Sequence, residues 1–536
     1  MRSLNINRSD FFQWFPINLL INLIQFIFSP HLNPPLIREG VLPLRHWQKS
    51  RWGSGLLILF ILFSQIYAQD NRLRLKQADL LENITIDGQS IQFLRGNVIF
   101  KKGDMVMNCD WARFDQKTEQ GFLFGNVSMV EDVQNLTCDS LFVDSPKDIM
   151  IAYSNTHVWD TTYSLVADTL FYFSELDSGS ANGNATLIQD KQTIKGDRIE
   201  YFEIPESDGV SYAARGNVSI AEEGRLATCG EAIYDRKNGK TTLRIKPKIL
   251  DNNQTISGSE IFLEYDEDVL KSLFIPSEAH ATHPSTGIRQ WTEIVDGDTL
   301  TFEDSLSFTD DMTGSILRGF FTDGIMDSMR LEGMATTLYH ILEDSVYQGK
   351  NEASGDTIIM NFADNDLQKI FVNGGSRGTY TPDSTGADVD GPIHYESEDI
   401  DYDVVNEFTD LHGDAVIDYT NINLKAGFIN VAWRYNLLKA FPESERDSSY
   451  GWIRPSMVEN GEEPMVGDTM IYNLETRHGK VIQGTTKAED GYYHGQEIRN
   501  QDMDIFYIDD AAYTTCDLDN PHFHFKSRRM KMINED

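Results

Sequence analysis

The residues best suited to chemistry lie in the stretch "YTTCDLDNPHFHF", from Tyr513 to Phe525. This stretch contains Cys516 and two alternating histidines, His522 and His524. A thiolate and two imidazoles can bind Zn²⁺, but the spacing Cys-x5-His-x-His matches no usual zinc-finger pattern. Alternating histidines are also expected when both lie on one face of a strand. Three hypotheses stay open for this stretch: a metal site, a catalytic cysteine, or a junction to a further segment.

Aspartates recur at regular intervals in the first half of the chain. Each follows a small residue, and the four positions are Asp110, Asp139, Asp168 and Asp197. Such a column could bind a row of calcium ions, but no Asp-x-Asp spacing supports it. We therefore expect these side chains to form turns and to hydrogen-bond to nearby backbone.

Three cysteines share a column with alanine and glycine. Cys109, Cys138 and Cys229 are expected to pack as small residues, and a disulfide between Cys109 and Cys138 in successive repeats is possible but not required. The chain has no Gly-x-Ser-x-Gly elbow, phosphate-binding loop or His-Glu-x-x-His motif. We therefore expect no catalytic residues, no metal and no cofactor, and a protein that is not an enzyme.

The charge balance excludes one class of partner. The 536 residues include 46 Lys and Arg against 83 Asp and Glu, a formal net charge of -37. Such a surface repels phosphate backbones, so we expect no nucleic-acid partner. Hydrophobic residues make up 40% and aromatic residues 11% of the chain, which is too many for a disordered acidic protein. The length predicts several domains or a repeat array.

The first 68 residues are predicted to be a targeting segment. Arg45, Lys49 and Arg51 precede the apolar run Leu56 to Phe63, and Ala68 offers a small residue for cleavage. The run is far shorter than the ~20 residues of a membrane-spanning helix, so a secretory signal peptide is expected. Residues 1–44 are interpreted as an over-extended start. The mature protein would then lie in a compartment beyond the inner membrane, where disulfides are permitted.

A repeat dominates the first half. Small residues stand at Cys109, Cys138, Ala167, Gly196, Cys229 and Gly258, spaced 29 apart except for one interval of 33. "GNV" or "GNA" recurs upstream of several of them and is expected to open each unit as a turn. A fixed period indicates stacked supersecondary units, none of which can bury its apolar face alone.

The apolar columns of the repeat predict strands. Apolar residues alternate with period two within each run, at even offsets before the small residue and at odd offsets after it. This change of parity requires a bulge or bend in every strand. The candidate inner, groove-lining residues are Phe100, Met107, Ala112, Phe114, Met129, Leu136, Leu141, Val158, Leu165, Leu170, Leu187, Ile194, Ile199, Ile220, Ile249 and Ile261.

The second half repeats more loosely. "GDT" recurs at residues 297–299, 355–357 and 467–469, with polar insertions predicted to be loops or seams at about His280–Ile294, Pro382–Pro392 and Glu443–Pro464. We therefore expect a first repeat block over 75–275, a second over 276–480 and a separate segment over 481–536.

The repeated "GNV…CD" units resemble the OstA-like (organic solvent tolerance) domains of the lipopolysaccharide transport system over most of residues 75–480. Residues 491–533 resemble the segment of LptD-like outer-membrane assembly proteins that joins the periplasmic domain to a β-barrel. In that family a cysteine of this segment is crosslinked to the barrel, and Cys516 matches its position. The resemblance thus favours the junction hypothesis, with the chain as either the amino-terminal part of an LptD-like protein or a shorter OstA-like protein.

The resemblance implies an all-β fold, an elongated jelly-roll or curved solenoid of ~29-residue repeats. It implies a lipid-binding conduit in lipopolysaccharide transport to the outer membrane. The implied partners are the lipid A acyl chains of lipopolysaccharide, other jelly-roll components of the bridge and an outer-membrane barrel. Two alternatives remain: a β-helix enzyme that processes polysaccharide, and a surface adhesin solenoid whose interior is filled by its own side chains.

Overall fold

The computed structural model describes residues 73–533 apart from short internal gaps, the longest of which are 384–390 and 443–453. The predicted signal peptide over 1–68 and most of the predicted seams at Pro382–Pro392 and Glu443–Pro464 lie outside the described residues. These residues form two compact units, an N-terminal unit that ends at Leu243 and a C-terminal unit that begins at Arg244. Within them, no helix is long and apolar enough to cross a membrane.

The N-terminal unit consists of strands and one short 3-10 turn. Its elements are β1 (Arg74–Gln77), β2 (Leu80–Ile86), β3 (Gln89–Lys102), β4 (Met105–Asp115), β5 (Gln120–Glu131), β6 (Gln134–Asp144), η2 (Ser145–Lys147), β7 (Ile149–Trp159), β8 (Tyr163–Phe173), β9 (Ser178–Gln189), β10 (Gln192–Ile204), β11 (Gly209–Glu222), β12 (Arg225–Asp235) and β13 (Lys240–Arg244).

The C-terminal unit is also built of strands. Its elements are β14 (Lys248–Asp251), β15 (Gln254–Ser257), β16 (Glu260–Asp266), β17 (Val269–Ile275), β18 (Ala279–Val295), β19 (Asp298–Gly314), β20 (Ile316–Thr322), β21 (Ile325–Glu343), β22 (Val346–Ala363), β23 (Asp366–Pro382), β24 (Ile393–Asp403), β25 (Phe408–Tyr419), β26 (Ile422–Ala432), η4 (Trp433–Tyr435), β27 (Leu437–Phe441), β28 (Ser456–Glu459), β29 (Met465–Val466), β30 (Thr469–Asn473), β31 (Gly479–Ala488), β32 (Gly491–Asp502), β33 (Ile505–Thr514) and β34 (Phe525–Ile533).

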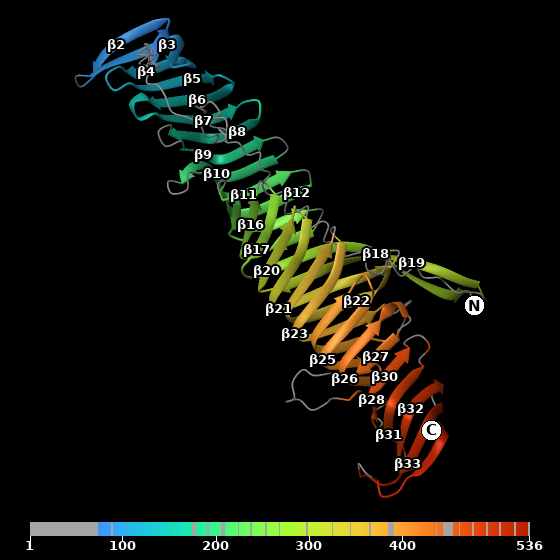
Figure 1. Cartoon of the computed structure of the whole chain (residues 1–536). Helices are drawn as coiled ribbons and strands as arrows, with labels where there is room; N and C mark the ends of the chain where they lie inside the picture. Colours follow the sequence, from blue (N-terminus) through green and yellow to red (C-terminus); the bar gives the residue numbers. More distant parts are fainter. Residues whose placement is uncertain are drawn as a thin grey trace, which may run out of the picture. The chain divides into compact units, whose positions relative to one another are not determined.

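Successive strands of the N-terminal unit pair antiparallel with one another from β2 to β12 (Figure 1). Each ~29-residue repeat of the sequence is therefore two strands joined by tight polar turns. The predicted all-β fold built of repeats is confirmed. A β-helix stacks its strands in parallel, so this antiparallel order also argues against the β-helix alternative.

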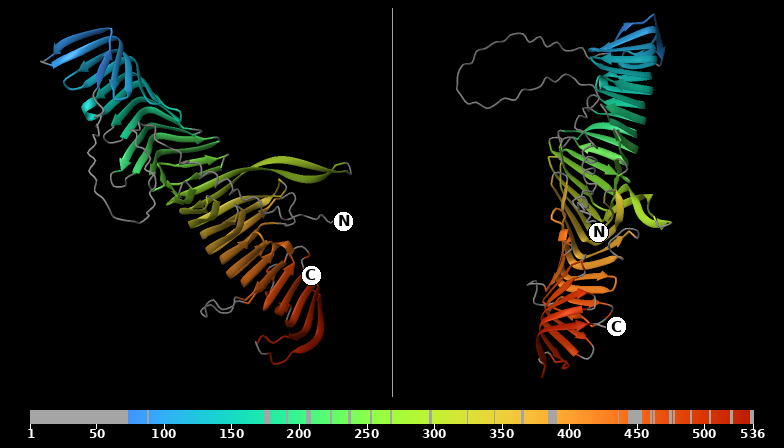
Figure 2. Two further views of the ribbon diagram at one scale, coloured as in Figure 1. Left: turned by 45° about the horizontal axis from the view of Figure 1, so that its top comes forward. Right: turned by 90° about the vertical axis from the view of Figure 1, so that its right-hand side faces the viewer.

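Each strand bends where the sequence changes parity. In β4 the buried residues are Met105, Met107 and Cys109 before the bend, then Ala112 and Phe114 after it. The register against β5 shifts between Asn108 and Trp111, which is the bulge that the parity change predicted. We call the half of each strand on the Met105 side of this corner limb 1, and the half on the Asp115 side limb 2. The bent strands stack into a V-shaped profile (Figure 2).

The corner is made by a glycine, an asparagine and an aspartate from neighbouring strands. In β5, Gly125 and Asn126 both have positive φ, of 72° and 44°. Asn126 Nδ2 donates to Asp110 Oδ2 of β4 at 2.8 Å. The same contact recurs at Asn97–Asp79, Asn155–Asp139, Asn184–Asp168 and Asn217–Asp197.

This geometry corrects two expectations. The Gly-Asn pairs do not open a unit as a turn between strands, since they lie in the middle of a strand and provide the two left-handed residues of its corner. The aspartates accept from an asparagine side chain on the next strand, a cross-strand contact that one repeat read alone does not reveal.

The cysteine column is also arranged differently from the prediction. Cys109 lies on β4 and Cys138 on β6, and β5 pairs with both strands. The two cysteines are therefore two strand spacings apart, about 9–10 Å, which is too far for a disulfide. Cys109 and Cys138 are both free thiols in the structure.

The C-terminal unit continues the corners with other residues. A Cβ on Gly374 of β23 would lie 2.5 Å from Asp356 Oδ2 of β22, so Gly355-Asp356, in one of the "GDT" repeats, forms a corner. The "GDT" at 297–299 was wrongly equated with it, because Asp298 pairs with Val295 at the tip of a hairpin. Gly413 packs on Glu398 in the same way, a corner without the motif.

One predicted loop is a strand. His280–Ile294 lies within β18, which pairs with β19 along its whole length. This β18–β19 hairpin extends away from the neighbouring strands of its unit (Figures 1 and 2). The prediction failed because a strand with solvent on both faces needs no apolar alternation, which is the signal used to recognise strands.

The corner geometry predicts opposite effects for two glycines of β5. Gly125→Ala places a Cβ 2.5 Å from Asp110 Oδ2 at a φ of +72°, and should lower the free energy of unfolding of the N-terminal unit by about 1–3 kcal/mol. Gly121→Ala, whose Cβ meets only ordinary contacts at 3.4 Å or more, should be neutral or stabilising. Urea unfolding followed by tryptophan fluorescence measures both. Equal effects of the two changes would contradict the proposed role of the corner.

Candidate functional site: the inner apolar face

The predicted groove residues lie on the inner face of the bent strands. Fifteen of the sixteen are buried, with no residue among them more than 7% exposed, namely Phe100, Met107, Ala112, Phe114, Met129, Leu136, Leu141, Val158, Leu165, Leu170, Leu187, Ile194, Ile220, Ile249 and Ile261. The exception is Ile199, which is half-buried. The N-terminal unit therefore brings its columns together on one inner face, and Ile249 and Ile261 are buried within the C-terminal unit.

The two limbs pack on each other through this surface. Phe100 belongs to limb 1 and Phe114 to limb 2, yet their ring centroids are 5.5 Å apart. At the free ends of the limbs, Lys102 of limb 1 forms a salt bridge with Asp148, which follows limb 2 of β6. The V is therefore closed by apolar contacts inside and by an ion pair at its mouth.

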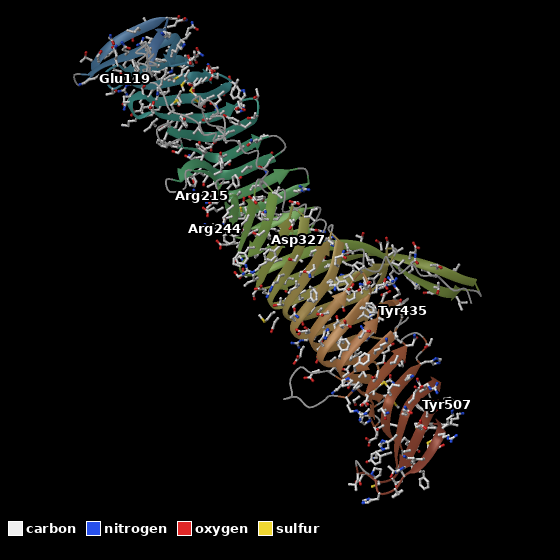
Figure 3. All side chains as sticks on the ribbon, viewed as in Figure 1. Glu119, Arg215, Arg244, Asp327, Tyr435 and Tyr507 are labelled. Atoms are coloured by element: carbon white, nitrogen blue, oxygen red, sulfur yellow. The ribbon has the colours of Figure 1, made fainter. Side chains whose placement is uncertain are left out.

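The outer face has the opposite chemistry. Arg215 of β11, labelled in Figure 3, forms ion pairs with Glu231 of β12 at 2.7 Å and with Glu200 of β10. Such half-exposed pairs contribute little to stability. The outer face also carries exposed aromatic side chains, such as Trp111 and Phe122, which are 42% and 37% exposed. The buried apolar columns lie on the inner face.

A small cavity lies between the limbs. Its volume is about 20 Å³, and apolar side chains from both limbs line it, including Met129 and Leu136 of limb 1 and Leu141 and Leu170 of limb 2. Glu131, Gln134 and Asn135 form its polar edge. The lining suits an acyl chain, whereas the volume is close to that of a single water molecule. A lipid can enter only if the limbs move apart.

The C-terminal unit has a more polar interior that the sequence analysis missed. Tyr395 of β24 donates from its hydroxyl to Asn351 Oδ1 of β22 at 3.0 Å. Burial raises the pKa of Tyr395 to about 12. A Cβ on Gly378 would lie 2.1 Å from the Tyr395 ring, so this glycine provides the space for the tyrosine. The sequence around Gly378 gives no signal of this contact, because Tyr395 lies on the next strand.

The chemistry-bearing stretch places the thiol of Cys516 beside one of its two histidines, His522. Cys516 Sγ lies 3.5 Å from His522 Nδ1. Hydrogen bonds from the backbone N–H groups of His522 and Leu518 and from the His522 side chain lower the pKa of Cys516. The described residues contain no group of three or more His, Cys, Asp and Glu side chains that could hold a metal ion. The geometry provides an accessible, activated thiol.

The other cysteines have the opposite character. Cys109 and Cys138 are buried at the corners of β4 and β6. Burial raises the pKa of Cys109 to about 11 and that of Cys138 to about 12. At neutral pH both are protonated and inert.

Comparisons with known proteins match two family models within residues 70–269. Residues 70–202 match the family model described as OstA-like protein, and residues 167–269 match that of the LptA/(LptD N-terminal domain) LPS transport protein. The solved structures that match include LptH of Pseudomonas aeruginosa, the LptA homologous periplasmic component of its lipopolysaccharide transport device. It is 12% identical, with a TM-score of 0.14, and the match covers 26% of this chain and 79% of that one. No curated protein matches.

The two family models together cover residues 70–269 without a break. Over this region the chain is similar to OstA-like protein and to the LptA/(LptD N-terminal domain) LPS transport protein.

The thiol environments predict a large difference in reactivity. In the folded protein at pH 7.5, iodoacetamide should alkylate Cys516 rapidly and Cys109 and Cys138 only after unfolding, because the thiolate is the nucleophile. The midpoint of the rate against pH for Cys516 should lie below that of a free thiol, and His522→Ala should raise it. Mass spectrometry of tryptic peptides checks this. Equal labelling of Cys516 and Cys109 would contradict the account.

Proposed function

We propose that this chain is a periplasmic carrier that holds the lipid A acyl chains of lipopolysaccharide between the limbs of its bent strands on the way to the outer membrane. One observation carries the proposal: a row of buried apolar side chains runs from strand to strand along the inner face of a region with lipopolysaccharide-transport domains. The polar sugar head would stay outside the mouth of the V.

The driving force would be burial of hydrocarbon. Each CH₂ group removed from water contributes ~0.8 kcal/mol. An entering chain must replace the contacts that the limbs make with each other, such as that between Phe100 and Phe114. Because each repeat offers a similar set of apolar residues, the free energy of the bound lipid changes little from one repeat to the next. Movement along the row then needs no large energy barrier at any repeat.

The mouth of the V would control entry. The Lys102 side chain is 12% exposed and that of Asp148 is 26% exposed, so this pair is partly shielded from solvent. Opening the limbs would break the pair and return both charges to water. Lipid phosphates, which are anionic, offer Lys102 an alternative partner at the moment of opening.

Partners are assigned on the same basis. Free strand edges allow end-to-end addition to other jelly-roll components of a lipopolysaccharide bridge. Cys516, accessible and activated, would form the disulfide to an outer-membrane barrel that the resemblance implies. The acidic chain would take no nucleic acid, cofactor or metal.

A structural solenoid such as an adhesin is the second candidate. The observation that favours it is the small volume of the cavity between the limbs, about 20 Å³. In that case the inner side chains would serve only to fill the interior. The two functions differ in whether lipid ever reaches the inner face.

Photo-crosslinking in cells separates the two functions. A photoreactive amino acid at Phe100, Leu141 or Leu187 should capture lipopolysaccharide, because these side chains face the space between the limbs. The matched outward positions Arg113 and Lys195, both exposed, should capture little. Immunoblotting for lipopolysaccharide on the purified protein gives the readout. Equal capture of lipopolysaccharide at inner and outer positions, or no capture at the inner positions, would contradict the carrier proposal.

A further inference from the structure

Polar side chains end the inner apolar columns on three successive strands of the N-terminal unit. Tyr163 of β8, Gln189 of β9 and Gln192 of β10 stand at the free ends of limb 1, and the register pairs Gln189 with each of the other two. We call these three residues the polar row. Because side chains alternate along a strand, the polar row faces the same side as the inner residues two places further along, which are Leu165, Leu187 and Ile194.

The polar row is buried, and two of its hydrogen-bond donors are not used within the chain. Tyr163 is 5% exposed, Gln189 6% and Gln192 7%. Tyr163 Oη and Gln192 Nε2 have no hydrogen-bond partner among the described residues. Burial raises the pKa of Tyr163, so its hydroxyl keeps its proton at neutral pH. Buried polar atoms are nearly always paired, and leaving a donor unpaired is costly. Two such donors on neighbouring strands point to a ligand that accepts hydrogen bonds.

The free ends of limb 2 carry tyrosines on the same strands. Tyr172 of β8 and Tyr201 of β10 are 5% and 7% exposed and lie on either side of Gly179 of β9 in the register. Met150 and Tyr212 pack against these two tyrosines. At β8–β10 the V is therefore apolar at depth, and both limbs carry side chains with polar ends near its mouth.

The polar row continues the polar edge of the small cavity between the limbs. Glu131 and Gln134, which belong to that edge, are paired with each other at the free ends of limb 1 of β5 and β6. Tyr172 lines the same cavity, so the cavity reaches the strand that carries Tyr163. A chain that widened and filled this cavity would bring its polar end close to the polar row.

The chemistry of the polar row narrows the ligand. An amide N–H and a phenol hydroxyl are neutral donors, which suit a neutral acceptor such as a carbonyl oxygen. A carboxylate or phosphate would need a buried cation, but β8 and β9 contain no Lys or Arg, and Lys195 and Arg198 of β10 are exposed. An ester or amide that joins an acyl chain to its head group places a carbonyl oxygen where the hydrocarbon ends.

We propose that the polar row binds the carbonyl oxygen of an ester- or amide-linked acyl chain, with Tyr163 and Gln192 as the donors. This inference rests on the proposed function, because it requires an acyl chain between the limbs. It adds what the site selects, which is a chain linked to its head group through a carbonyl rather than through an ether. Hydrocarbon burial would drive entry, and the carbonyl contacts would discriminate between linkages.

Two amphiphiles with the same sugar test the proposal. Dodecanoyl maltose has an ester carbonyl, whereas dodecyl maltoside has none. Isothermal titration calorimetry of the full chain with each amphiphile, below its critical micelle concentration, gives the two dissociation constants. Tyr163→Phe and Gln192→Leu should each weaken binding of the ester about three- to tenfold and leave binding of dodecyl maltoside unchanged. Thr193→Val removes a hydroxyl from the opposite face of β10; it is the matched control and should change neither constant.

The unbound protein gives a second measurement. Because Tyr163→Phe and Gln192→Leu remove unpaired buried donors, each should leave the midpoint of urea unfolding unchanged or raise it, which also shows that the variants fold. Equal weakening for both amphiphiles, no weakening for the ester, or lower midpoints in both variants would overturn the proposal and assign the polar row to packing or to buried water. If the unaltered chain bound neither amphiphile, the proposed function would fail, and this inference with it.

Discussion

The rest of the structure depends on the corner in each strand. A strand whose side chains alternate strictly has one apolar face and no means to fold that face onto itself. A bulge lies where the Gly-Asn pair of one strand meets the small-Asp pair of the next. This bulge reverses the alternation of apolar and polar side chains without ending the strand. Both halves then turn the same apolar surface inward. The contact of Asn126 with Asp110, repeated from strand to strand, holds all the corners in line.

The aligned corners let the protein bury its own apolar side chains. Under the proposed function, the same apolar face could also bind a lipid. The limbs meet through Phe100 and Phe114 and are joined at the mouth by Lys102 and Asp148. The buried apolar residues of the inner face recur from strand to strand along the unit. Packed interfaces tend to have a few discrete arrangements rather than a continuous range. The structure shows the closed V, and under the proposed function an opened V would be a second arrangement that an amphipathic lipid favours by burying its chains.

Much of this fold could be predicted from the sequence because each position of the repeat occurs several times, so the apolar positions could be recognised by comparing the repeats. The parity change predicted the corner, and fifteen of the sixteen proposed inner residues are buried. What could not be predicted depends on contacts between strands. The Asn–Asp contact joins residues 16 or more apart in sequence, and the separation of Cys109 from Cys138 depends on β5 lying between them. The β18–β19 hairpin gave no apolar alternation in the sequence, because neither of its faces is buried. The role of Gly378 could be interpreted only once the structure placed Tyr395 against it.

The central claim is that the limbs part to admit lipid. It is tested most directly by a distance measured across the mouth of the V. Asp104 and Lys117 are exposed residues that follow limb 1 of β3 and limb 2 of β4. Spin labels at Asp104→Cys and Lys117→Cys, in a chain with Cys516→Ser, report this distance by double electron–electron resonance. The account predicts a longer distance when purified lipopolysaccharide is bound. An unchanged distance in a sample with lipid stably bound would contradict it.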